Sequence, residues 1–321
     1  MKILVTGGAG YIGGVAVKHL LDAGHQVAVF DSLELGHKQA LDPRAGFILG
    51  DLRDFAQIRA AMDTTRPDAV MHFAAYALVG ESSADPGKYF RNNDLGGLNL
   101  ADAMLECGVK RIVFSSTCAT YGQPETMPIT EDTPQRPTNP YGQSKLIFEQ
   151  ILDWYRRIHG FKPVFLRYFN ACGAEGALGE DHKIETHIIP NILKVPLGQS
   201  PSVKIFGDDY NTPDGTCVRD YIHISDLARA HLLAITSDFC GALNLGTGAG
   251  FSVKQIIAAA REVTGHPIPA EIAPRRAGDP DFLVSDPSRA LREIGWQAQY
   301  TSPRDIIASA WAWHQKHPNG Y

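Results

Sequence analysis

Two side chains in the stretch NPYGQSKLIFEQ, residues 139–150, could work together as an acid–base pair. Tyr141 and Lys145 are four residues apart at the start of a predicted amphipathic helix, so they share one face of that helix. A phenol has a pKa of about 10 and is a poor base at neutral pH, but a neighbouring ammonium favours the phenolate. The pair is therefore a candidate neutral-pH base, although Tyr–Lys pairs at this spacing also occur by chance.

A run of hydroxyl side chains is predicted near Tyr141 and Lys145. The predicted strand 111–114 runs into Ser115, Ser116 and Thr117. Ligands of doubly wound α/β folds bind at the carboxyl ends of strands. We therefore expect these hydroxyls beside a bound cofactor, in the same region as Tyr141.

A glycine-rich loop, TGGAGYIG, follows the first predicted strand and precedes a helical pattern. Gly7, Gly10 and Gly13 fit the spacing GxxGxxG, and Gly8 with the last two fits GxGxxG. Glycines allow the tight turn and the close approach of backbone to a pyrophosphate, while the helix N-terminus offers N–H groups to phosphates. The strand–loop–helix context favours a dinucleotide site over a purely structural turn.

An acidic residue follows at the place where such sites bind a ribose. Asp31 ends the second predicted strand, 27–30, near the offset of about 20 residues at which an acid holds the ribose 2′-hydroxyl. A carboxylate there would repel the extra phosphate of NADP, so the sequence favours NAD. The positive nicotinamide ring would then lower the pKa of Tyr141 further.

The elements that position these residues alternate between strand and helix. Short apolar runs are typical of buried parallel strands, and helical patterns such as 14–23 separate them. This alternation predicts an α/β fold with a doubly wound parallel, Rossmann-type sheet. The predicted strands are 3–5, 27–30, 47–49, 69–74, 111–114 and 164–168.

The second half of the chain predicts a smaller, interleaved C-terminal lobe. We assign residues 1–170 to the NAD-binding domain, and Pro, Gly and Asp become frequent after it. A strand at 243–245 would return to the main sheet, so residues 221–248 are expected to rejoin the first domain. Residues 171–220 and 249–321 would form the smaller lobe. The apolar spacing of 306–313 predicts a helix that packs on the core.

Composition excludes several classes of protein. The chain has 321 residues, 44% hydrophobic and 20% charged, which is ordinary for a soluble globular enzyme. A net charge of -5 gives no reason to expect nucleic acid or an anionic membrane as a partner. The apolar run at the N-terminus is too short for a secretory signal, and no stretch approaches the roughly 20 apolar residues of a membrane span.

Cysteine and histidine patterns predict neither a disulfide framework nor a metal site. The five cysteines are odd in number and form no CxxC, which fits a reducing cytoplasm. The twelve histidines form no HExxH. His182 and His187 are interpreted as polar surface, and Cys118 as a buried, inert thiol.

The motifs together resemble the extended short-chain dehydrogenase/reductase family. They are TGGAGYIGG at 6–14, Asp31, FSST at 114–117 and YGQSK at 141–145. Four further stretches narrow the resemblance to the UDP-galactose 4-epimerase branch of that family: HFAAYALVGES at 72–82, LRYFNACGA at 166–174, DGTCVRDYIHISDLA at 214–228 and APRRAGDP at 273–280. The similarity runs almost from end to end.

The resemblance implies a role for each matching residue. Tyr141 would be the base, Lys145 would hold the nicotinamide ribose and tune the base, and Thr117 would bind the sugar O4. Cofactor binding would involve Gly7, Gly10, Tyr11, Ile12, Gly13, Asp31, Ser32, Asp51, Leu52, Phe73, Ala74, Ala75, Asn93, Ser115, Tyr141, Lys145 and Tyr168. The UDP-sugar would be held by Thr117, Tyr141, Asn170, His187, Arg219, Arg276 and Asp279.

The implied activity is the interconversion of UDP-glucose and UDP-galactose with tightly held NAD. Transient oxidation at C4, rotation of the flat 4-keto sugar and return of the hydride would invert a carbon whose hydrogen is not acidic. The resemblance also implies a homodimer. Arginines suit the diphosphate because they bind phosphate through two parallel hydrogen bonds.

Three positions depart from the pattern of the family. Many relatives have a lysine where Ala77 stands, and NNVxGT where this chain reads NNDLGG at 92–97, with Leu95 at a usually polar position. The position thought to gate the sugar pocket falls near Leu283. Relatives with a tyrosine there are thought to exclude N-acetylated sugars and those with a small residue to admit them, and leucine is intermediate in size.

The same residues bear on several other activities. A UDP-N-acetylglucosamine or UDP-pentose or uronate 4-epimerase would use the same machinery and stays open. A 4,6-dehydratase needs carboxylates directly after the threonine, where Cys118 and Ala119 stand. A dehydrogenase that releases NADH would leave the UDP-type motifs without purpose. A non-catalytic NAD(H) sensor is disfavoured by the intact Tyr141, Lys145 and Thr117.

Overall fold

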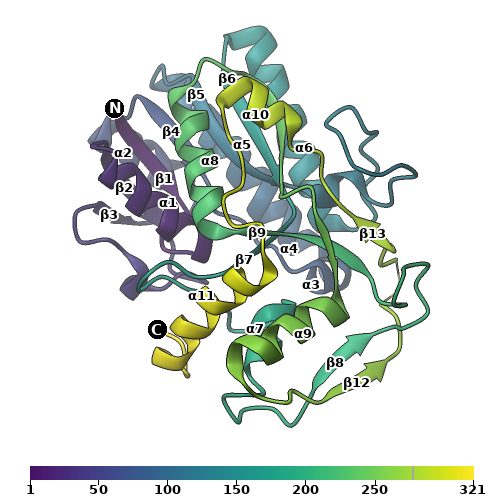
Figure 1. Cartoon of the computed structure of the whole chain (residues 1–321). Coiled ribbons are helices and arrows are strands. Elements are labelled where there is room, and N and C mark those ends of the chain that lie inside the picture. Colours follow the sequence, from purple (N-terminus) through teal and green to yellow (C-terminus); the bar gives the residue numbers. More distant parts are fainter. Residues whose placement is uncertain (277) are drawn as a thin grey trace.

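The main layer of the molecule is a parallel sheet with helices on both faces (Figure 1). The computed structural model describes residues 1–276 and 278–321. Seven strands pair in the order β10-β6-β5-β4-β1-β2-β3. Their bounds are β1 Lys2–Thr6, β2 Gln26–Asp31, β3 Gly46–Leu49, β4 Ala69–His72, β5 Arg111–Thr117, β6 Lys162–Tyr168 and β10 Gly241–Leu245. This order confirms the predicted doubly wound sheet, and the strand order reverses beside β1, where such folds bind ligands.

Each predicted strand of the main sheet forms, with small shifts at the ends. The strand predicted at 69–74 ends at His72, and the one predicted at 111–114 extends through Thr117. Ser115 to Thr117 belong to β5 because they pair in parallel with Leu166 to Tyr168 of β6. The predicted return of 243–245 is confirmed, since β10 pairs with β6.

Helices cover the two faces of the sheet through separate apolar clusters. The cluster on one face joins α1 (Tyr11–Asp22), α8 (Ile224–Thr236) and α10 (Ser288–Ile294) to the sheet. The cluster on the other face joins α2 (Phe55–Thr65), α5 (Gly96–Glu106) and α6 (Pro140–His159). Between β4 and α5 lie α3 (Val79–Ala84), α4 (Pro86–Tyr89) and the π-helical turn η2 (Phe90–Leu95). Short 3₁₀ turns are η1 (Lys38–Ala40) and η3 (Cys118–Tyr121).

The smaller lobe lies beyond the carboxyl ends of these strands (Figure 1). Its sheets contain β7 (Asn170–Cys172), β9 (Val218–His223), β11 (Gly250–Ser252) and β13 (Phe282–Leu283), and separately β8 (Val203–Phe206) with β12 (Ala270–Ala273). Its helices are α7 (Ile188–Leu193), α9 (Val253–Thr264) and α11 (Pro303–Lys316). Residues 221–223 belong to β9, so the return of the chain to the main layer begins with α8. The apolar face of α11 packs into the core of this lobe, as its spacing predicts.

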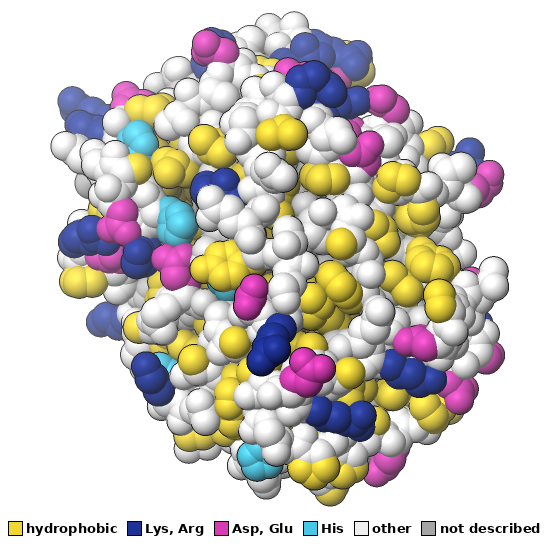
Figure 2. Space-filling model, viewed as in Figure 1, with side chains coloured by type: hydrophobic (Ala, Val, Ile, Leu, Met, Phe, Trp, Pro, Cys, Tyr) yellow, Lys and Arg dark blue, Asp and Glu magenta, His cyan; other side chains and the backbone are white. Residues whose placement is uncertain are grey.

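Among the described residues, no helix combines the length and apolar character that a membrane span requires. On the face drawn in Figure 2, acidic and basic side chains are interspersed and do not gather by sign.

Candidate active site

The glycine loop is built so that only glycine fits at two of its positions. Gly7 has a φ of +76°, and a Cβ there would lie 2.4 Å from the backbone nitrogen of Ala74. A Cβ on Gly13 would lie 2.2 Å from the carbonyl oxygen of Gly7. Helix α1 therefore starts inside the loop, at Tyr11 and not at residue 14. The result is a cradle of backbone at a helix N-terminus, which suits a pyrophosphate.

Asp31 closes one side of this cradle. Its carboxylate accepts hydrogen bonds from the backbone N–H of Ala9 at 3.0 Å and of Leu33 at 2.8 Å. These bonds hold the carboxylate at the end of β2, against the glycine loop. The position suits an acceptor for ribose hydroxyls, while the neighbouring Ser32 is exposed and its hydroxyl accepts from the N–H of Glu34 at 3.3 Å.

Tyr11 connects the cradle to the smaller lobe. Its phenol donates to the carbonyl of Gly173 at 2.5 Å, and its ring meets that of His182 edge-on. Ile12 is partly buried against the core cluster that joins α1 to the sheet. Both residues follow Gly10 of the glycine loop directly in sequence, and the hydroxyl of Tyr11 is already engaged within the protein.

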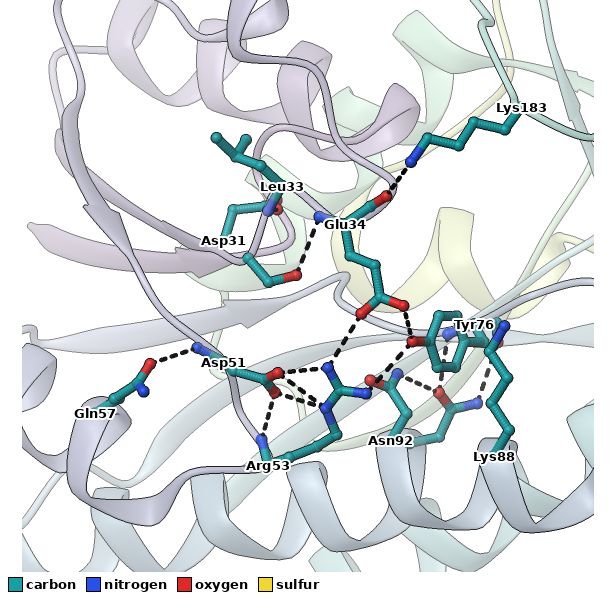
Figure 3. A network of polar contacts seen from close by, with 12 residues as sticks. Asp31, Leu33, Glu34, Asp51, Arg53, Gln57, Tyr76, Lys88, Asn92 and Lys183 are labelled. Atoms are coloured by element: carbon teal, nitrogen blue, oxygen red, sulfur yellow. Dashed lines mark hydrogen bonds and ion pairs between the residues drawn. The ribbon is translucent and has the colours of Figure 1, made fainter.

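An ionic network joins residues near the ends of β2 and β3 to Tyr76, as Figure 3 shows. Asp51 pairs with Arg53 at 2.5 Å, and Arg53 reaches Glu34 at 3.1 Å. The phenol of Tyr76 donates to Glu34, and Leu52 is buried beneath. Sequence reasoning named Asp51 and Leu52 and missed the other three, which carry no motif of their own.

The segment after β4 is fixed by backbone and amide hydrogen bonds. The N–H groups of Phe73 and Ala74 both donate to the carbonyl of Thr6, which brings residues 73–75 against the glycine loop. Asn93 accepts from the N–H of Tyr76 at 2.9 Å and donates to its carbonyl at 3.1 Å. Its amide also donates to the hydroxyl of Ser144 at 2.9 Å, so both amide hydrogens are used inside the protein.

The predicted acid–base pair begins a capped helix. Asn139 accepts from the N–H of Gly142 at 2.8 Å, and Pro140 occupies the first turn of α6. A Cβ on Gly142 would lie 2.5 Å from the carbonyl oxygen of Ala119, so glycine lets α6 approach η3 closely. This approach brings Tyr141 to the end of β5, near enough to Thr117 for that side chain to lower the pKa of the phenol. The structure therefore joins the two predicted catalytic residues.

Lys145 is buried one turn further along α6. Its Nζ donates to the carbonyl oxygen of Ser115 at 2.9 Å and lies 4.7 Å from the ring centroid of Phe114. Burial lowers the pKa of Lys145 to about 7, since the charged form loses its hydration. Lys145 is thus close to losing its charge in the neutral range.

The pKa of Tyr141 corrects one expectation. Burial and the nearby Tyr168 raise the pKa of Tyr141 well above its ordinary value, and the side chain of Thr117 offsets only part of that. We expected Lys145 to lower it. Within the protein alone, desolvation has a larger effect on the pKa of Tyr141 than Lys145 does. The same burial that raises the pKa of the phenol lowers the pKa of Lys145, so a smaller fraction of the lysine is charged.

Aromatic and imidazole groups gather around Ser115, beside this pair. The hydroxyl of Ser115 lies 3.1 Å from the phenol oxygen of Tyr168 and 3.2 Å from Nε2 of His231. The ring of Phe73 packs 4.6 Å from that of His231. Burial lowers the pKa of His231 to about 4, so it is neutral, and raises that of Tyr168 to about 12. Sequence reasoning missed His231, which comes from α8 far along the chain.

The predicted UDP-binding residues are distributed over the smaller lobe. Arg219 donates to Asp279 at 2.6 Å, and the phenol of Tyr210 donates to the other carboxylate oxygen at 3.2 Å. The guanidinium of Arg276 lies 4.2 Å from the ring centroid of Phe206. Asn170 begins β7, which pairs with β9 two residues beyond Arg219. The lobe thus offers two arginines and an aromatic surface, which suit a diphosphate and a base.

His182 and His187 belong to a polar cluster at the surface of the smaller lobe. Both lie in a cluster with Glu180 and Glu185, in which ligand-type atoms of all four lie within 4.8 Å of one another. The buried Glu180 pairs with His187, and these acids raise the pKa of His187 to about 9 against the effect of burial. No local sequence motif predicts this cluster, because the four side chains come together only when the loop folds. The acids keep a positive charge on His187 near Arg276, whose own charge opposes it.

A buried ion pair behind the site also escaped sequence reasoning. Glu149 accepts from Arg167 at 2.5 Å and from the hydroxyl of Ser116 at 2.5 Å. Glu149 lies one turn beyond Lys145 on α6, and Arg167 lies in β6. The pair fixes α6 against the ends of β5 and β6, which sets the position of Tyr141. The helical spacing Tyr141, Lys145 and Glu149 is the signal that could have found it.

The departures from the family pattern have distinct surroundings. Leu95 is 46% exposed, whereas Leu283 is half-buried and pairs in register with Arg219. Leu283 also packs against Tyr121 and Phe169, beside Cys118. Burial raises the pKa of Cys118 to about 12, in agreement with an inert thiol.

Comparison with known proteins gives one consistent family. The model of the NAD-dependent epimerase/dehydratase family matches residues 3–246. A UDP-glucose 4-epimerase of Streptococcus mutans is 54% identical over 330 residues, covering 100% of this chain and 99% of that protein, and one of Halalkalibacterium halodurans is 51% identical over 327 residues, covering 100% and 98%. A crystal structure of a UDP-glucose 4-epimerase superposes with a TM-score of 0.97 at 50% identity, covering 100% and 99%. The Bifidobacterium longum enzyme, solved with NAD⁺ and UDP, gives 0.95 at 42% identity over 100% of both chains.

Proposed function

The chain belongs to the NAD-dependent epimerase/dehydratase family, and we propose that it interconverts UDP-glucose and UDP-galactose by inverting the sugar at C4. The observation that carries the proposal is the bond from Nζ of the buried Lys145 to the carbonyl oxygen of Ser115, which holds the start of α6, with Tyr141, at the carboxyl end of β5 near Thr117. This supports a role for Tyr141 as a proton carrier beside the cofactor and a sugar hydroxyl.

The cofactor is NAD, and the residues at the glycine loop fit it. Gly7 and Gly13 allow a tight turn in which a Cβ would collide with neighbouring backbone, and Asp31 offers ribose hydroxyls an acceptor. The glycine loop and the carboxylate of Asp31 together suit a dinucleotide whose ribose carries no 2′-phosphate. When bound, NAD⁺ supplies an acceptor for the C4 hydride and later returns it, so the reaction needs no outside oxidant.

The side chains of the protein handle the proton. Tyr141 accepts the O4 proton as the C4–H bond breaks, directly or through the hydroxyl of Thr117, and returns it when the C–H bond forms again. Because burial raises the pKa of Tyr141, the phenolate needs positive charge nearby. Lys145 contributes such a charge when protonated, and its bond to the carbonyl of Ser115 holds it in place.

The smaller lobe would hold the UDP part and leave the sugar free to turn. Arg219 and Arg276 would bind the diphosphate, with Asp279 orienting Arg219 and His187 adding positive charge. Asn170 lies beside this group on β7. Strong contacts to the nucleotide and weak ones to the hexose allow the 4-keto sugar to present either face.

Rival activities lack support from the arrangement. Cys118 and Ala119 follow Thr117, so a 4,6-dehydratase would lack its carboxylates there. UDP-N-acetylglucosamine and UDP-pentose or uronate epimerases use the same machinery, but the relatives of about 50% identity are named UDP-glucose 4-epimerases. Leu283, beside Arg219, is the residue at which the choice of sugar would be tested.

Two further properties are proposed with this function. The enzyme would work in the cytoplasm, where the five free cysteines would stay reduced. It would form a homodimer, and Trp154 and Ile158, one turn apart on α6 and 60% and 66% exposed, supply an apolar surface for it. Light scattering of the purified protein would report its mass in solution, and a monomeric mass would refute the dimer.

The test of the activity uses the purified protein without added cofactor. UDP-galactose is supplied, and proton NMR follows the formation of UDP-glucose. Conversion without added NAD would establish 4-epimerisation with retained cofactor. No conversion, even after NAD is supplied, would refute the proposal, and UDP-N-acetylglucosamine and UDP-xylose would then be tested.

A further inference from the structure

Asp94 carries a buried carboxylate without a partner. Both of its oxygens are shielded from solvent, and neither makes a hydrogen bond with any described residue. An ionised carboxylate in such a place is costly, because it has lost water without gaining donors. A buried polar group of this kind calls for a physical explanation.

The π-helical turn η2 places Asp94 next to the helix of the acid–base pair. The amide of Asn93 donates to the hydroxyl of Ser144 at 2.9 Å, which joins η2 to α6. Asp94 and Lys145 are the residues that follow these two anchors in sequence. Their charges act on each other: Lys145 lowers the pKa of Asp94, and Asp94 raises that of Lys145.

The other titratable groups around Lys145 do not supply an available negative charge. Glu149, one turn along α6, is paired with Arg167 and accepts from Ser116. His72, on β4, has its pKa lowered to about 3 by burial and by the charge of Lys145, so it is neutral. Among the described residues, Asp94 is the one carboxylate that acts on Lys145 and has no cation of its own.

The two groups titrate in the same range. Burial raises the pKa of Asp94 to about 7 and lowers that of Lys145 to about 7. As the pH rises through 7, Asp94 becomes negative, and its charge then opposes the loss of the proton from Lys145. Below that pH Asp94 is neutral and has no such effect.

We propose that Asp94 is a positioning residue for the epimerisation: its buried carboxylate, presented by η2, keeps Lys145 in the ammonium form beside Tyr141. The inference rests on the proposed function, because it assigns Asp94 a role in the chemistry of that site. Asp94 acts through Lys145 and does not itself need to touch the sugar or the cofactor. Its effect belongs to the alkaline side of the pH range, where Lys145 would otherwise lose its charge.

The experiment compares the pH profile of kcat from pH 6 to 10 for the wild type, Asp94→Asn and Asp94→Ala. We expect both variants to lose activity about one pH unit earlier on the alkaline side, so that kcat falls about tenfold at pH 9. At pH 6 their kcat should match the wild type, because Asp94 is protonated there. Bound NAD per chain, measured after denaturation, should be unchanged.

Glu106→Gln is the matched control. Glu106 ends α5, is exposed and pairs with Arg59, so the variant removes the same charge far from Lys145. Its profile should superimpose on that of the wild type. The proposal would be overturned if the pH profiles of the Asp94 variants superimposed on that of the wild type. It would also be overturned if kcat of these variants were lower than that of the wild type by the same factor at every pH.

A second measurement does not depend on turnover. The melting temperatures of Asp94→Asn, Lys145→Met and the double variant are compared at pH 8, with NAD content recorded. If the two charges interact, the loss in the double variant should be smaller than the sum of the single losses. Additive losses would refute the interaction whatever the activity of the enzyme. A wild type that fails to epimerise would instead count against the proposed function.

Discussion

Tyr141→Phe removes one oxygen atom from the centre of the proposed mechanism. The phenol lies near the side chain of Thr117, whose hydroxyl accepts a hydrogen bond from the N–H of Ala119 at 3.1 Å. The substitution therefore leaves no charged group unpaired. The fold and the binding surfaces should survive it.

The expected loss is confined to the chemical step. A positioned acid–base group contributes about 10² to 10⁴ in rate, which corresponds to about 3–5 kcal/mol of barrier. We expect kcat to fall about 10²-fold to 10⁴-fold or more, while KM and the Kd for UDP stay within about twofold of the wild-type values. The free energy of unfolding should change by about 1 kcal/mol or less, the net value of a neutral hydrogen bond.

Tyr155→Phe is the matched control, because it removes a phenol oxygen from the same helix. Tyr155 donates to Asp102, away from the pair, so its loss should cost about 1.5–3 kcal/mol of stability and leave kcat unchanged. Conversion of UDP-galactose is followed by NMR, UDP binding by calorimetry and stability by denaturant titration. A Tyr141→Phe protein that retains more than a tenth of the wild-type kcat would refute the role of the phenol.

Three further predictions concern the surroundings of the site. Glu149→Gln leaves the buried side chain of Arg167 without its carboxylate partner, and it should lower the free energy of unfolding by about 3–5 kcal/mol. Denaturation by guanidinium chloride measures this change, and a value below about 1 kcal/mol would contradict the assigned pairing. Arg219→Lys replaces a forked donor by a single ammonium and should raise the Kd for UDP about tenfold or more by calorimetry, while kcat at saturation changes little; unchanged affinity would remove Arg219 from the diphosphate site. His187 has a pKa raised to about 9, so it is charged below that pH and loses its charge as the pH rises through it; UDP affinity should fall between pH 8 and 10, and His187→Gln should remove that dependence.

The sequence alone determined the framework of the molecule. Short apolar runs and helical patterns specify the parallel sheet, because burial on both faces requires such strands. The glycine loop with Asp31, and the spacing of Tyr141 and Lys145, are local patterns, so the cofactor class and the candidate base could be predicted from them. Backbone geometry at Gly7 and Gly13 then confirms why those residue types are needed.

Only the tertiary structure decided the electrostatics of the site. The pKa of Tyr141 is raised and not lowered because packing against β5 and η3 removes water from the phenol, and that loss depends on every neighbour at once. Likewise, the pairing of Glu149 with Arg167, the gathering of Glu180, His182, Glu185 and His187, and the place of Asp94 beside Lys145 depend on contacts that no local pattern encodes. Sequence patterns record which side chains an element presents, whereas charge and burial belong to the surroundings that folding assembles.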